Sequence, residues 1–117
     1  TSAETAVRDL VRGLGMRFTT HDRSLPGTPD LVFAARRKVI FVHGCFWHGH
    51  SCRRGKSPSS NLAFWAEKLA RNKRRDRAAK SALTRRGIRY LVVWECELKF
   101  KAKLETKLRR FLAESTQ

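Results

Sequence analysis

The sequence has few acidic residues and lacks any long apolar run. Only ten Asp and Glu stand against 26 Lys and Arg among 117 residues, so the net charge is +16 at pH 7. Solubility does not require such an excess, which indicates a polyanionic partner, with nucleic acid ahead of an anionic membrane. No stretch approaches the roughly 20 apolar residues of a transmembrane helix or the pattern of a signal peptide. We therefore expect a soluble cytoplasmic protein with no membrane partner.

Cysteine and proline are also scarce, with three residues each. Three cysteines are an odd number, and two of them alternate with histidines, so metal ligation in a reducing compartment is favoured over a disulfide framework. Hydrophobic residues still make up 41% of the chain, which excludes general disorder. The length suits a single domain spanning residues 1–117.

The apolar periodicity predicts the order helix, three strands, helix, strand, helix. The expected helices span 3–14, 61–86 and 98–113, and the expected strands span 16–20, 31–34, 38–42 and 88–94. Gly87 is expected to end the second helix, and residues 53–60 are polar and basic as in a surface loop. A helix between the third and fourth strands permits a parallel crossover. The fold class expected is therefore α/β, with a mixed central sheet and helices on both faces.

Residues 41–52 hold three of the four histidines and two of the three cysteines. Cys45, His50 and Cys52 bring three nitrogen or sulfur ligands into one loop, one fewer than tetrahedral zinc requires. Cys96, just past the last strand, is the obvious fourth ligand. A closed set of three cysteines and one histidine would be structural rather than catalytic. His48 could replace His50, and spacing alone does not decide between them.

The remaining histidines and one aspartate suggest hydrolytic chemistry. If His50 binds zinc, His43 and His48 stay available for proton transfer. Asp30 follows Pro29 at the head of a strand, where a carboxylate commonly holds a metal. A carboxylate-bound Mg²⁺ and an imidazole acting on a phosphodiester would suit metal-assisted hydrolysis.

Each of these acidic residues also has a plainer interpretation. Glu4 stands three residues after Thr1, the spacing of a helix capping box. Asp30 could simply stabilise its turn, because aspartate favours such positions. His21 is interpreted as a surface residue.

Four segments together resemble the very short patch repair (Vsr) DNA mismatch endonucleases. In order and spacing they are Leu25–Asp30 (LPGTPD), Phe41–His48 (FVHGCFWH), Phe64–Lys68 (FWAEK) and Val93–Cys96 (VWEC). The resemblance covers essentially the whole chain, and the combination of motifs is specific. It implies a restriction-endonuclease-like core of the PD-(D/E)XK type with a structural zinc. It also implies Mg²⁺-dependent nicking of one DNA strand 5′ to the thymine of a T:G mismatch, the product of 5-methylcytosine deamination.

The resemblance also assigns roles to individual residues. It implies zinc ligation by Cys45, His50, Cys52 and Cys96. Mg²⁺ would be held by Asp30 and the main-chain carbonyl of Val42, with Glu4 reaching it through water. His48 would act as the general base and His43 would assist at the phosphate. A monomer is expected, with repair proteins and a cytosine methyltransferase system as partners.

Two departures from the family are visible. Val42 replaces a common Thr, which is tolerable if only the main-chain oxygen binds metal. The family has a segment before the helix of Glu4 that embraces DNA, and we expect this chain to lack it because the sequence begins at Thr1.

Aromatic and basic residues are expected to read the DNA. In the family, aromatics at Phe46, Trp47 and Trp65 wedge into the base stack, although Trp47 or Trp65 could instead be core residues. Lys68 and Asn72 share a helical face with Trp65 and could read the wobble pair. Phosphate contacts are expected from Arg53, Arg54, Lys56, Lys73, Arg74, Arg75 and Arg77. The competing interpretations are a non-catalytic zinc module that binds DNA and a nickase of similar fold with another target.

Overall fold

The computed structural model describes residues 2–48, 50–52 and 60–114. Their elements are α1 (Ser2–Gly13), β1 (Thr19–Thr20), β2 (Leu31–Phe33), η1 (Ala34–Arg36), β3 (Lys38–His43), α2 (Leu62–Arg85), β4 (Arg89–Trp94), η3 (Glu95–Lys99) and α3 (Lys101–Ala113). The predicted order of helices and strands is thus confirmed. Within these ranges, no helix combines the length and apolar character needed to cross a membrane.

The four strands form one mixed sheet in the order β1-β2-β3-β4. β1 and β2 pair antiparallel, as do β2 and β3, whereas β3 and β4 run parallel because α2 carries the chain between them. The mixed sheet was expected, but β1 is shorter than the predicted strand 16–20. Met16 and Phe18 pack against the core instead of pairing with β2. The last α-helix also begins later than predicted, because residues 95–99 form the 3₁₀ helix η3.

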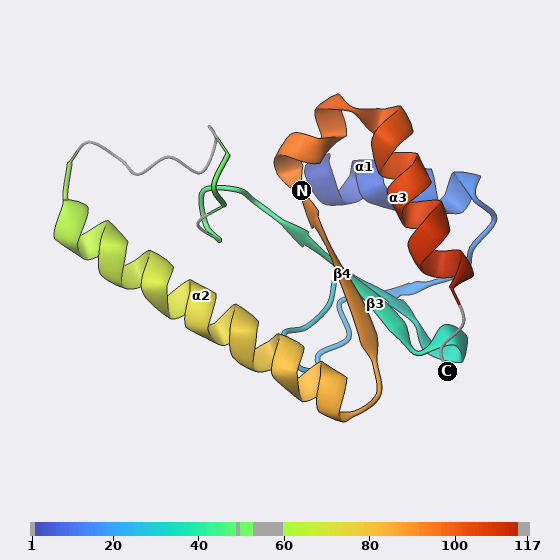
Figure 1. Cartoon of the computed structure of the whole chain (residues 1–117), viewed down its shortest axis with the longest axis horizontal. Helices are drawn as coiled ribbons and strands as arrows, with labels where there is room; N and C mark the ends of the chain where they lie inside the picture. The colour runs from blue at the N-terminus through green and yellow to red at the C-terminus, as the bar shows by residue number, and fades with distance from the viewer. Residues whose placement is uncertain (1, 49, 53–59, 115–117) are drawn as a thin grey trace.

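Helices cover both faces of the sheet, with α1 and α3 on one side and α2 on the other (Figure 1). Alternate strand residues supply the two cores, as the period of a strand requires. Ile40 and Val93 pack with Val11 of α1 and Leu108 of α3. On the opposite face, Val32, Val39, Phe41 and Leu83 form the second core. Phe41 and His43 therefore point toward the α2 side of the sheet.

The turn before β2 depends on a glycine. Gly27 has a φ of +78°, and a Cβ there would lie 2.8 Å from the Cβ of Ala79 and 3.0 Å from the Phe41 ring. Glycine alone fits both the backbone conformation and this close approach. The turn therefore lies against α2 just before the chain reaches Asp30. Gly87, with a φ of +73°, follows α2 as predicted for a helix terminator.

Candidate active site

The ends of β3 and β4 lie side by side and organise the site. His43 and Trp94 are register partners at the last positions of the two parallel strands. Cys45 and Cys96 each follow two residues later, so the sheet brings Cys96 beside the loop that holds the other cysteines. The expected proximity of these two strand ends is confirmed.

One group, here called the Cys/His cluster, consists of Cys45, His50, Cys52 and Cys96. Its four ligand atoms all lie within 4.8 Å of one another, and Cys96 Sγ is 3.7 Å from His50 Nδ1. A sulfur and a nitrogen bound to the same tetrahedral zinc would be separated by about 3.6 Å. The structure groups His50 with the cysteines, whereas His48 lies in a second group.

Two thiols of the Cys/His cluster resist ionisation. Burial raises the pKa of Cys45 to about 12, and burial likewise raises the pKa of Cys96. Such thiols stay protonated unless a positive charge compensates the thiolate. Four soft ligands at this close spacing suit Zn²⁺, with no ligand position left for substrate.

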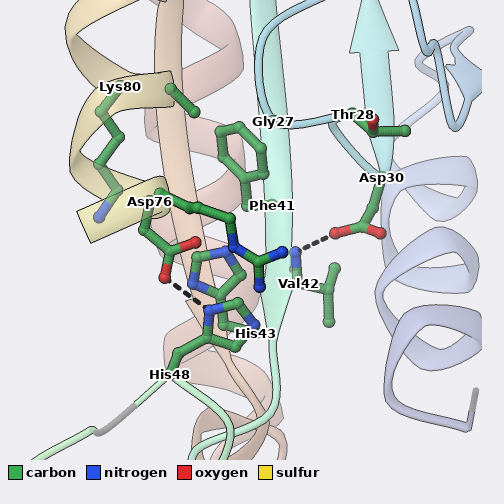
Figure 2. A pocket seen from close by; sticks show the side chains of 11 residues that line it. Gly27, Thr28, Asp30, Phe41, Val42, His43, His48, Asp76 and Lys80 are labelled. Carbon is green, nitrogen blue, oxygen red and sulfur yellow. Dashed lines mark hydrogen bonds and ion pairs between the residues drawn. The ribbon is translucent and has the colours of Figure 1, made fainter. Parts of the chain in front are cut away.

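The second group consists of His43, His48 and Asp76 (Figure 2). The two imidazole rings stack with centroids 3.7 Å apart and planes 2° from parallel. His48 Nδ1 lies 2.6 Å from Asp76 Oδ2. In-plane lone pairs on parallel rings do not converge on a single point, so this stack is poorly arranged to share one metal. Proton transfer and phosphate contact suit it better.

His43 is the more enclosed of the two histidines. Its side chain is buried, and Nδ1 finds no hydrogen-bond partner within the described part of the chain. Burial, followed by the neighbouring His48, lowers the pKa of His43 to about 4. The ring is therefore neutral at pH 7, and it remains able to donate or accept a hydrogen bond.

The third group brings Glu4 of α1 together with His21 and Asp30. His21 Nε2 lies 2.9 Å from Glu4 Oε2 and 3.8 Å from Asp30 Oδ1. Asp30 Oδ2 accepts a hydrogen bond of 2.6 Å from the Val42 backbone N–H, which joins the head of β2 to the end of β3 (Figure 2).

The pKa values of the two carboxyl groups shift in opposite directions. Burial raises the pKa of Asp30 to about 6; the Val42 hydrogen bond opposes the shift, and the charge of Glu4 reinforces it. For Glu4, burial favours a higher pKa, but interactions with His21, Asp30 and Arg8 outweigh it and leave the pKa lowered. Two crowded carboxylates offer hard oxygen ligands that suit Mg²⁺, and a cation between them would relieve their repulsion.

A pocket of about 400 Å³ separates Asp30 from His48 (Figure 2). Phe41, Val42 and His43 of β3 lie along it, with Asp76 and Ala79 of α2. Arg75 and Lys80 add two positive charges to its wall. A space with carboxylate on one side, imidazole on the other and cations beside it can accept a phosphodiester.

The predicted DNA-reading residues lie together at the start of α2. Lys68 Nζ is 5.1 Å from the centroid of the Trp47 ring and 5.6 Å from that of Trp65. Phe46 packs edge-on against both tryptophans at 5.2 Å, and Trp47 is 47% exposed. Asn72 Nδ2 donates to the Trp47 carbonyl oxygen. Neither tryptophan belongs to the two apolar cores of the described residues, so both remain available at the surface.

Two contacts were not foreseen from the sequence. Asp76 is 28 residues from His48, and only the fold brings them together. A signal did exist, because Asp76 is the single acid within the basic run 73–77 and follows Asn72 by one helical turn. His21 is half-exposed, as expected of a surface residue, but it also contacts Glu4 and approaches Asp30.

The expected phosphate contacts divide into two sets. Lys73, Arg74, Arg75 and Arg77 lie on α2. Arg53, Arg54 and Lys56, with most of the predicted surface loop, lie outside the described residues.

Comparison with known proteins supplies the class. Residues 1–54 match the family described as DNA mismatch endonuclease Vsr. A type II nicking enzyme of Xanthomonas oryzae pv. oryzae is 50% identical over 98% of this chain and 85% of its own length. A type II nicking enzyme of Neisseria meningitidis is 42% identical over 97% of this chain and 81% of its own length. The DNA mismatch endonuclease Vsr of Escherichia coli is 46% identical over 89% of this chain and 67% of its own length.

The chain is accordingly an endodeoxyribonuclease, and DNA is its substrate. It belongs to the Vsr family of DNA endonucleases, as the sequence motifs indicated.

Proposed function

We propose that this protein is a Mg²⁺-dependent nickase with a restriction-endonuclease-like core that cleaves one DNA strand 5′ to the thymine of a T:G mismatch. The observation that carries the proposal is the pocket with Asp30 on one side and His48, bonded to Asp76, on the other. Such a pocket provides metal-binding oxygens and a proton acceptor on either side of one phosphodiester.

Asp30, the main-chain carbonyl of Val42 and, through water, Glu4 would hold the Mg²⁺. The Val42 N–H donates to Asp30 Oδ2, which fixes the carboxylate beside that peptide. A cation bound there would polarise the phosphodiester and stabilise the charge that develops on cleavage. His21, 2.9 Å from Glu4, would restrict where the Glu4 carboxylate points.

His48 is the proposed general base. When its Nδ1–H donates to Asp76, the Nε2 lone pair is available to take a proton from the attacking water. Asp76 would fix that tautomer and stabilise the imidazolium that forms. His43 lies parallel to His48 and stays neutral, so it can hydrogen-bond the phosphate without competing for the proton.

A structural zinc on Cys45, His50, Cys52 and Cys96 would brace the loop that carries His48. Its role would be conformational, because all four ligand positions come from the protein. Cys45 and Cys96 each follow by two residues the paired strand ends His43 and Trp94, so bracing the cluster would steady the imidazoles as well.

Mismatch recognition would use Phe46, Trp47 and Trp65 with Lys68 and Asn72. Exposed aromatic rings can replace base stacking, and unstacking costs least at a mismatch. The Lys68 ammonium over the tryptophan rings and the Asn72 amide lie on the same side of α2 and can hydrogen-bond base edges.

The test is nicking of an end-labelled T:G duplex beside its T:A control, with Mg²⁺ and with EDTA. We expect one nick in the thymine strand of the T:G duplex, none in the T:A duplex, and no cleavage in EDTA. Equal nicking of both duplexes would favour a nickase with another target. Two of the relatives are named as type II nicking enzymes, without mention of a mismatch. Binding without any nicking would support the non-catalytic module.

A further inference from the structure

Trp94, the last residue of β4, lies between the Cys/His cluster and the stacked histidines. Its ring stacks on His50 with centroids 4.1 Å apart and planes 17° from parallel. It meets His43 in an edge-to-face arrangement, with centroids 5.3 Å apart and planes at 75°, and His48 likewise at 6.3 Å and 73°. One indole therefore contacts a candidate metal ligand and both candidate catalytic imidazoles.

The backbone holds this indole in place. Trp94 is the register partner of His43, so both side chains leave the sheet on the α2 face at the same level. The Trp94 N–H donates to Glu97 Oε1 at 2.9 Å, and both Glu97 oxygens accept from Lys107 Nζ at 2.9 Å. These hydrogen bonds attach the turn that contains Cys96 to Lys107 of α3.

Ordinary core packing does not account for the position of Trp94. The ring is only partly buried and belongs to neither of the two apolar cores found among the described residues. It lines a second pocket with His48 and His50, beside Lys73 and Arg77. Within the described residues, the rings recorded against Trp94 are all imidazoles, those of His43, His48 and His50.

We propose that Trp94 is a positioning residue that couples the Cys/His cluster to the His43–His48 stack. The inference rests on the proposed function of those histidines. Stacking on His50 fixes the plane of that ring and keeps Nδ1 directed at Cys96 Sγ, 3.7 Å away. The edge contact with His43 limits sideways motion of the histidine stack, so an ordered metal cluster keeps His48 aligned with the pocket.

The experiment compares Trp94→Leu, which removes the ring, with Trp94→Phe, which keeps a smaller one. Phe111→Leu is the control, because it removes a buried aromatic ring of α3 that belongs to the opposite core. Four quantities are measured for each protein: zinc content, the absorption spectrum after Co²⁺ substitution, the dissociation constant for duplex DNA, and the nicking rate at saturating enzyme.

For Trp94→Leu we expect folded protein with unchanged DNA affinity. The nicking rate should fall by about 10- to 100-fold, the order expected when a catalytic group is displaced by up to an ångström. The Co²⁺ spectrum should shift because the His50 ligand is no longer held in one plane. Trp94→Phe should recover much of both properties, and Phe111→Leu should resemble the parent in both.

Folded, zinc-loaded Trp94→Leu that nicks at the parental rate would overturn the proposal. If that variant does not fold, Trp94→Phe decides: its Co²⁺ spectrum and nicking rate must change together or both stay parental, and a change in only one contradicts the coupling. Each nicking rate is divided by the parental rate on a duplex that the parent nicks. The comparison therefore remains valid even if the preferred target is not a T:G mismatch. If the parent nicks nothing, the proposed function fails, and an unchanged Co²⁺ spectrum in Trp94→Leu would separately overturn the contact with the cluster.

Discussion

The Cys/His cluster and the group around Asp30 lie at the same edge of the sheet, but they are assembled differently. Three ligands of the cluster fall between Cys45 and Cys52, and only Cys96 comes from elsewhere in the chain. The Asp30 group instead takes Glu4 from α1, His21 from the segment after β1 and Asp30 from the head of β2. The cluster is a local loop closed by one distant residue, whereas the proposed hydrolytic site exists only once the fold has formed.

Their protonation differs in the same way. Burial raises the pKa of Cys45 to about 12, so this thiol stays protonated at pH 7 unless a cation is bound beside it. Burial raises the pKa of Asp30 only to about 6, and Asp30 is therefore mostly ionised at pH 7 even without a cation. Under the proposed function, zinc in the cluster should stabilise the fold, whereas Mg²⁺ beside Asp30 should be required for catalysis.

The largest expected effect comes from Cys96→Ala. This change removes the only ligand from outside the loop, so the cluster can no longer tie β4 to residues 45–52. Metal binding to structural zinc sites contributes on the order of 10 kcal/mol at neutral pH, and much of that would be lost to the folded state. We expect substoichiometric zinc, a lower melting temperature and no nicking. A variant with full zinc content and parental melting would refute the four-ligand assignment.

Asp30→Asn should separate the two regions most sharply. The amide keeps an oxygen for the Val42 N–H but removes the charge that Mg²⁺ requires. Nicking should fall by at least about a thousandfold, because a bound metal supplies several kcal/mol of charge stabilisation. Zinc content and DNA binding, measured by gel shift, should persist.

The control for that change is Asp22→Asn, in an exposed turn where the carboxylate accepts hydrogen bonds from the backbone and hydroxyl of Ser24. It removes the same charge nearby and should leave nicking at the parental rate. If the Asp30 variant nicks as the control does, Asp30 is only a turn residue.

Substituting His48 should lower the nicking rate more than substituting its partner Asp76. His48→Ala should lower the nicking rate by about 10²- to 10⁴-fold, the usual contribution of a general base. Asp76→Asn should cost less, about 10-fold, because an amide oxygen can still accept from Nδ1 although the charge is gone. Glu67→Gln, an exposed acid on the same helix, serves as the control. Single-turnover rates measure all three, and an Asp76→Asn rate equal to the parent's would remove Asp76 from the mechanism.

The sequence predicted the fold and the Cys/His cluster well because both follow local rules. Short continuous apolar runs identified β3 and β4, Gly87 marked the end of α2, and the close spacing of Cys45, His50 and Cys52 indicated a metal-binding loop. Spacing alone did not decide between His50 and His48, since both lie within the same short loop; the family resemblance favoured His50, and the structure groups His50 with the cysteines. The contact of Asp76 with His48 was not predicted, because it joins α2 to the loop across 28 residues.

The smallest expected effect is on the free energy of unfolding in the absence of metals. Substitutions in the two regions should change it in opposite directions. The pKa of Asp30 is raised to about 6, chiefly by burial, from roughly 3.9 in an unfolded chain. The folded state therefore binds a proton more tightly, and this contribution to stability is fully present below about pH 4 and is lost as the pH rises through about 6. Above that pH, the folded protein carries an unfavourably buried carboxylate.

Asp30→Asn removes that cost, whereas Cys96→Ala removes only favourable contacts. In EDTA at pH 7, Asp30→Asn should raise the free energy of unfolding by about 1–2 kcal/mol, less than the full pKa shift implies because the carboxylate is partly exposed to solvent. The gain should disappear near pH 4. Asp22→Asn should show no such gain, because hydrogen bonds from Ser24 lower the pKa of that exposed carboxyl. Urea unfolding of the parent and the three variants at pH 4 and pH 7 measures these differences. An Asp30→Asn variant less stable than its parent at pH 7 would show that the buried carboxylate is already compensated within the protein.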